Sequence, residues 1–102
     1  METTILSINL ISSNPNVRSG RPVIDGTGIC VSDIVAAVRF HNMTPETILE
    51  DAYPELTLAQ VHAALAYYYE HQTDIDDDMT KRDQIATEMK EKRVGSRHPP
   101  LF

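Results

Sequence analysis

The chain has 102 residues, of which 41% are hydrophobic and 24% charged, and its formal net charge is −6. This length suits one small domain, and no apolar run approaches the roughly 18 residues that suggest a membrane span. Because Cys30 is the single cysteine and the N-terminus has no basic signal-peptide region, we expect a cytoplasmic protein without disulfides or membrane contact.

The charge is distributed unevenly along the sequence. Residues 1–73 carry three arginines against eight acidic residues, a net charge of −5. Residues 74–102 carry six basic and seven acidic residues, a net charge of −1. This contrast predicts an acidic globular domain over 1–73 and a densely charged extension over 74–102. Because affinity for nucleic acid depends mainly on Lys and Arg that neutralise phosphates, the domain lacks the usual charge of a DNA-binding protein.

Two short strands are predicted at the start of the chain. Residues 4–11 place Leu6, Ile8 and Leu10 on one face of a strand, and residues 22–24 are its obvious partner across a turn-rich connection. An isolated strand must find a neighbour. A hairpin within the chain and a pair with a second copy of the chain would both provide one.

Three helices follow, each with a recognisable start. Ser32 is the expected N-cap of the first helix, and Thr44 precedes a proline at the first position of the second. Thr57 and Gln60 form a capping box for the third. Pro54 prevents the second and third helices from joining. The expected spans, in order, are residues 32–40, 45–51 and 58–71.

The third helix carries three consecutive tyrosines. Its expected buried face consists of Leu58, Val61, Leu65 and Tyr68. Since three consecutive residues cannot all point inward, Tyr68 is expected in the core and Tyr67 and Tyr69 are candidates for contact with a partner. The helix contains no Lys or Arg.

A fourth helix is predicted from Asp74 to about Lys92, supported by acid–base pairs four residues apart. Its apolar stripe is thin and consists of Ile75, Met79, Ile85, Ala86 and Met89. So narrow a stripe stabilises a helix poorly on its own domain. The helix therefore either lies loosely on the surface or binds another chain. Residues 94–102 lack periodicity, and we expect them to be mobile or held by a partner.

The residue patterns predict neither a catalytic site nor a metal or cofactor site. An EF-hand loop counted from Asp74 would place Met79 where glycine is required and Ile85 where the bidentate glutamate belongs. The four histidines show no metal-ligand spacing with one another or with Cys30. We therefore expect a protein that is not an enzyme, and a buried, unreactive Cys30.

The stretch RPVIDGTGICVSDI (21–34), followed by TPE (44–46) and YPELT (53–57), resembles the bacterial domain-of-unknown-function 433 family over roughly residues 15–72. The resemblance implies an antitoxin-like, VapB-type protein with a helix-turn-helix of homeodomain-like or winged-helix type. It also implies a PIN-like ribonuclease toxin as partner. In such pairs the folded part of the antitoxin binds operator DNA and an extension blocks the toxin.

The sequence departs from the family pattern at its glycine-threonine turn. In the family, arginines usually flank that turn and a proline follows it. In this chain those positions are occupied by Asp25, Gly28 and Cys30. Any phosphate contact made by those arginines is absent, and Asp25 would repel DNA. The remaining candidates for DNA contact are Arg18, Arg21, Arg39, Thr57 and Gln60.

Two functional hypotheses follow. The first is a protein-interaction module, a homodimer through the N-terminal strand or third helix, whose extension folds on binding to a toxin. Met79, Ile85 and Met89 would supply apolar contacts, and Arg93 and Arg97 would cover the acidic metal-binding residues that the resemblance places at the toxin's centre. The second is a DNA-binding autorepressor whose dimer collects arginines from two chains. A third hypothesis is a solitary scaffold or orphan member of the family that has lost both roles.

Overall fold

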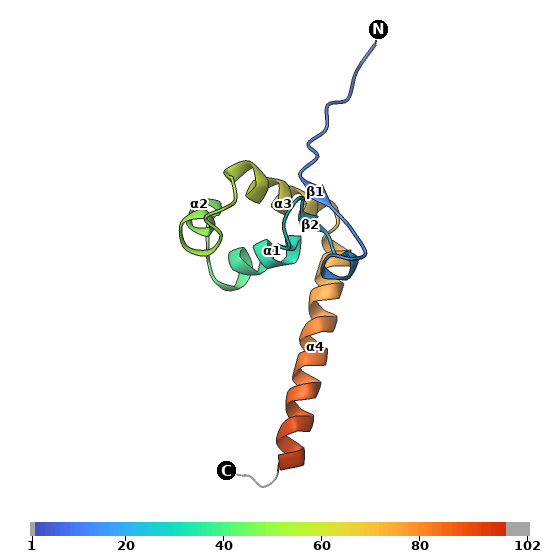
Figure 1. Ribbon diagram of the computed structural model, residues 1–102, viewed down its shortest axis with the longest axis vertical. Coiled ribbons are helices and arrows are strands. Elements are labelled where there is room, and N and C mark those ends of the chain that lie inside the picture. Colours follow the sequence, from blue (N-terminus) through green and yellow to red (C-terminus); the bar gives the residue numbers. More distant parts are fainter. Residues whose placement is uncertain (1, 98–102) are drawn as a thin grey trace. The chain divides into compact units, whose positions relative to one another are not determined.

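The computed structural model describes residues 2–97, and the side chains of residues 2–89. The chain divides into two compact units, Met1–His71 and Gln72–Phe102. Across the described residues the fold is mostly helical, with four helices and a short two-stranded antiparallel sheet near the N-terminus (Figure 1). This arrangement confirms the predicted fold class.

The sheet is a hairpin within one chain, but it is much shorter than predicted. β1 (Ile11–Ser12) pairs with β2 (Val23–Ile24), with Ile11 opposite Ile24. The prediction of a strand over residues 4–11 is therefore wrong for all but its last residue. The reason is that a tight turn follows β2, in which the Thr27 N–H donates to the Ile24 carbonyl at 3.0 Å. Beyond that turn β2 offers no backbone to pair with.

α1 (Val31–Phe40) begins earlier than predicted, because its N-cap is Cys30 and not Ser32. The Asp33 carboxylate accepts the Cys30 N–H at 2.9 Å, which is the reach of a residue at the third helical position back to the cap. Ser32 instead lies buried within the first turn. Cys30 is fully buried, which confirms the prediction of a small apolar side chain there.

The second and third helices have the predicted caps. Thr44 Oγ1 accepts the Thr47 N–H at 3.1 Å at the start of α2 (Pro45–Thr47), which continues into the π-helical turn η2 (Ile48–Ala52). α3 (Leu58–Glu70) starts with the predicted capping box.

The core of residues 2–71 forms where α3 meets the other elements. α3 packs against α1 and α2 and touches both strands. Its buried face consists of Val61, Ala64 and Tyr68, whereas Leu58 is 40% exposed, so that the predicted face is correct only in part. Each fully buried Ile or Val contributes about 1.5–3 kcal/mol to folding. The largest fully buried side chains are Ile24, Cys30, Val31, Ile34, Val35, Ile48 and Val61.

α4 (Gln72–Arg97) begins directly after the break at His71 and runs further than the predicted end near Lys92. One of the acid–base pairs predicted four residues apart, that of Asp78 with Arg82, forms, with 3.2 Å between the Asp78 carboxylate and the Arg82 Nε. Residues 98–102 of the predicted mobile tail lie outside the described residues. Within the described part of the chain, no helix combines the length and apolarity needed to cross a membrane.

Candidate functional site

Arg18 connects the loop between the strands to the start of α1. Its Nη1 donates to the Gly28 carbonyl at 2.8 Å and to the Asp33 carboxylate at 3.4 Å, the same carboxylate that accepts the Cys30 N–H. The backbone of Arg18 and Ser19 is left-handed, with φ of 50° and 59°. Non-glycine residues adopt this conformation only when surrounding contacts hold them there. The Arg18 side chain therefore acts within the fold.

The other two arginines of residues 2–71 also have internal partners. Arg21 donates from Nη1 to the Arg18 carbonyl at 3.3 Å. Arg39 donates from Nη1 to the Tyr68 hydroxyl at 3.1 Å, and its guanidinium carbon lies 5.5 Å from the centroid of the Phe40 ring. A DNA phosphate would have to compete with these contacts for all three candidate arginines.

Thr57 and Gln60 are likewise engaged, because together they cap α3. The Thr57 N–H donates to Gln60 Oε1 at 2.7 Å, and the Gln60 N–H donates to Thr57 Oγ1 at 3.2 Å. A Gln60 side chain that read an adenine edge would have to give up the first of these bonds, exposing an unpaired backbone donor at the helix start. The role of all five residues in DNA contact stays a prediction.

The outward face of α3 is apolar and not basic. Ala59, His62, Ala66 and Tyr69 are exposed and recur at three- and four-residue intervals, so that they share one face. Tyr69 is 69% exposed, whereas Tyr68 is buried as predicted. Such a face offers van der Waals contact to a protein and little attraction to a phosphate backbone.

Tyr67 and Tyr69, both predicted partner contacts, differ in their surroundings. The Tyr67 ring stacks on His71, with 4.1 Å between the ring centroids and 18° between the planes. The Tyr69 ring is tilted against Tyr68 at 5.3 Å and otherwise faces solvent. Tyr69 is thus the more available of the two for a partner.

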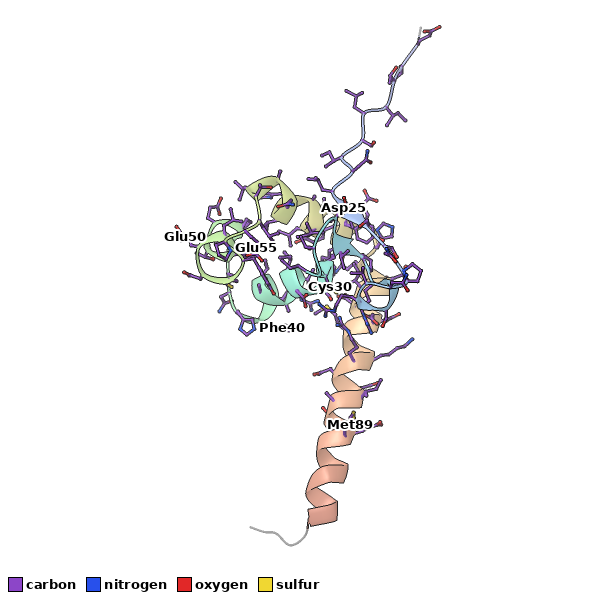
Figure 2. The ribbon with its side chains drawn as sticks, in the orientation of Figure 1. Asp25, Cys30, Phe40, Glu50, Glu55 and Met89 are labelled. Atoms are coloured by element: carbon purple, nitrogen blue, oxygen red, sulfur yellow. The ribbon has the colours of Figure 1, made fainter. Side chains whose placement is uncertain are left out.

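The connection around α2 is acidic. Exposed carboxylates at Glu46, Glu50, Asp51 and Glu55 surround it, and Figure 2 shows Glu50 and Glu55 on this part of the domain. Burial raises the pKa of Tyr53 above its ordinary value of 10.0, the negative charge of Asp33 adds to the rise, and Arg18 opposes it. A negative field of this kind repels DNA.

α4 presents apolar side chains among charged ones. Ile85 is 55% exposed, Met89, labelled in Figure 2, is 57% exposed, and Met79 is half-buried. At 3.6 residues per turn these three side chains fall within roughly a third of the helix circumference. Arg93 and Arg97 belong to the same helix, but their side chains lie outside the described residues.

The sequence predicted a paired strand over residues 4–11, but it did not predict that the aliphatic side chains of this segment, or that of Phe40, are exposed. Ile5 and Leu6 are 89% and 87% exposed, Ile8 is 78% exposed, and Phe40, at the end of α1 in Figure 2, is 64% exposed. The alternation over residues 4–11 marked this segment as a strand, and its lack of a partner could be seen only from the length of β2. Among the described residues, no group of three or more His, Cys, Asp or Glu residues could hold a metal ion.

Comparisons with known proteins identify similar sequences and structures. Residues 11–68 match the model of the family described as "Protein of unknown function (DUF433)". Among solved structures, the chain is similar to a DUF433 member protein from Anabaena variabilis, with 32% sequence identity and a TM-score of 0.63. That match covers 71% of this chain and 69% of the other. No curated protein matches the chain.

Proposed function

Because the chain belongs to the DUF433 family, we propose that it is an antitoxin-like interaction module whose helix α4 binds a PIN-like ribonuclease toxin. The toxin is the partner that the family resemblance implies. The observation that carries the proposal is the pair of large exposed apolar side chains, Ile85 and Met89, on a helix whose other exposed side chains over residues 72–89 are polar or charged apart from Ala86. Solvated helices have no need of such a pair, whereas helices that bind in a groove depend on one.

The arrangement of α4 supports binding of the helix in a groove. Ile85 and Met89 lie four residues apart and so form one patch, with Met79 two turns before it. The Asp78–Arg82 ion pair provides a charged border. In helix–groove complexes a few apolar anchors of this spacing supply most of the affinity, and charged neighbours select the partner.

The sequence beyond the patch is basic. Arg93 and Arg97 follow Met89 at four-residue intervals in the chain. A nuclease with acidic metal-binding residues at its centre would be complementary in charge to this end of α4. The proposed complex therefore combines an apolar anchor with an electrostatic one.

The test is co-expression with the product of the neighbouring gene, followed by affinity measurement. Ile85→Lys and Met89→Lys should each weaken binding by about tenfold or more, the effect of losing one anchor residue. Thr87→Lys adds the same charge on the opposite face of the helix and should leave the affinity nearly unchanged. A chain truncated after Gln72 should not bind at all. Unchanged binding by the truncated chain would refute the proposal.

The helix-turn-helix fold also supports a second candidate function, a DNA-binding autorepressor. Gel-shift assays with the gene's own upstream DNA at low salt distinguish the two. Our proposal predicts no sequence-specific shift, because Arg18, Arg21 and Arg39 have internal partners and the α3 face carries no cation. A specific shift that Arg39→Ala abolishes would favour the repressor.

A further inference from the structure

The chain that leads into β1 is an uncovered aliphatic segment. Ile5, Leu6 and Ile8 are all more than three-quarters exposed, and residues 3–12 contain no charged side chain. Figure 1 shows this segment continuing away from β1. Contiguous exposed aliphatic residues at the open edge of a sheet are a template for another strand.

The hydrogen bonds of the hairpin define which backbone groups are open. The Asp25 N–H donates to the Leu10 carbonyl at 2.8 Å, and Ile11 lies opposite Ile24. In an antiparallel ladder, bonded and non-bonded pairs alternate. Leu10 and Ser12 therefore direct their backbone groups toward β2, and Ile11 directs its N–H and C=O away from it. Asn9, Ser7 and Ile5 continue the outward edge if the segment extends β1.

The outward edge is complementary to itself in one register. If two antiparallel copies cross at Ile8, Ser7 lies opposite Asn9, Leu6 opposite Leu10 and Ile5 opposite Ile11. Every aliphatic residue then meets an aliphatic one, and the two polar residues meet each other. Crossing at Ser7 would instead place Ile5 opposite Asn9, and crossing at Asn9 would place Ser7 opposite Ile11. Both of these registers mismatch polar with apolar side chains.

We propose that residues 5–11 pair antiparallel with the same residues of a second copy of this chain, with Ile8 on the twofold axis. The pairing joins the two hairpins into one four-stranded sheet in the order β2–β1–β1–β2. The hydrogen-bonded pairs are Ile5 with Ile11 and Ser7 with Asn9. These are the residues whose backbone groups face away from β2, because the Leu10–Asp25 bond directs the backbone groups of Leu10 toward β2. The absence of charge in residues 3–12 means that no like charges meet across the axis. This inference is independent of the proposed toxin.

Oligomeric state tests the proposal directly. By analytical ultracentrifugation the full chain should have twice its 11.4 kDa mass, and Ile8→Lys should halve the observed mass by placing two ammonium groups on the axis. Because the Ile8 side chain is 78% exposed, the variant should keep the wild-type circular dichroism spectrum. Tyr69→Lys, on the exposed face of α3, should remain dimeric. A monomeric wild type, a dimeric Ile8→Lys variant, or dissociation by Tyr69→Lys would overturn the proposal.

Disulfide trapping tests the register. Ile8→Cys should cross-link to itself on oxidation, because facing residues in a non-bonded pair bring their Cβ atoms within about 4.5–5.5 Å. Ser7→Cys should not, because the two copies of that residue lie on a diagonal of about 7–8 Å. A mixture of Leu6→Cys and Leu10→Cys should give a cross-linked heterodimer. Native Cys30 is fully buried and does not compete. Cross-linking of Ser7→Cys in preference to Ile8→Cys would refute this register.

Discussion

Replacing Arg18 with alanine tests whether this arginine stabilises the fold or is available to DNA. The substitution removes the bond to the Gly28 carbonyl and the ion pair with Asp33. A hydrogen bond from a charged group contributes about 1.5–3 kcal/mol when buried. The Arg18 side chain is 41% exposed and that of Asp33 29%, so solvent screening reduces both contributions. We expect a net loss of about 1–2 kcal/mol in the free energy of unfolding.

Urea unfolding followed by circular dichroism measures this loss as a lower midpoint at unchanged slope. In a domain of this size the melting temperature should fall by about 4–8 °C per kcal/mol. Arg21→Ala removes a bond of 3.3 Å to the Arg18 carbonyl and is the matched arginine control. An Arg18→Ala variant with wild-type stability would refute the structural role and return this residue to the candidates for phosphate contact.

Three further predictions concern individual contacts, each measured by unfolding. Thr57→Ala should lower the free energy of unfolding by about 1 kcal/mol, because the Gln60 N–H loses its cap acceptor. Ser19→Gly should raise it by up to about 1 kcal/mol, because glycine adopts the left-handed backbone at φ 59° without steric cost; a destabilised variant would argue against that strain. The raised pKa of Tyr53 means that its neutral form is favoured by folding. That contribution is present below pH 10.0 and is lost as the pH rises through the folded-state pKa, so the wild type should lose more stability above pH 10.0 than Tyr53→Phe.

The features predicted well from the sequence are those decided by residues close to one another. Thr44 caps α2 and Thr57 caps α3 as expected, because each cap bond joins groups three residues apart. The helix over Val31–Phe40 was found from its apolar spacing, although Cys30 replaced Ser32 as the cap. The error arose because Asp33 supplies an acceptor that does not depend on the type of side chain at the cap position.

The features that the sequence could not predict depend on distant contacts. The alternation over residues 4–11 is a correct sign of a strand-like segment, but it contains no information on where β2 ends. The hydrogen bonds of the arginines also could not be predicted from the sequence, since Arg18 bonds to a carbonyl ten residues away and Arg39 bonds to Tyr68, 29 residues away. The sequence gives the charge of these arginines, but it does not show that their side chains bond within the fold.

The helical state of α4 alters the energetics of the proposed toxin complex. The sequence suggested an extension that folds on binding, and a segment of that kind loses about 2–5 kcal/mol of its interaction energy to ordering. α4 is helical over 26 residues in the isolated chain, which exceeds the roughly 12–15 residues below which isolated helices are marginal. Binding of a preformed helix avoids most of the ordering cost. In the proposed complex, the small patch formed by Ile85 and Met89 would therefore lose less of its interaction energy to ordering than the same patch on a disordered tail.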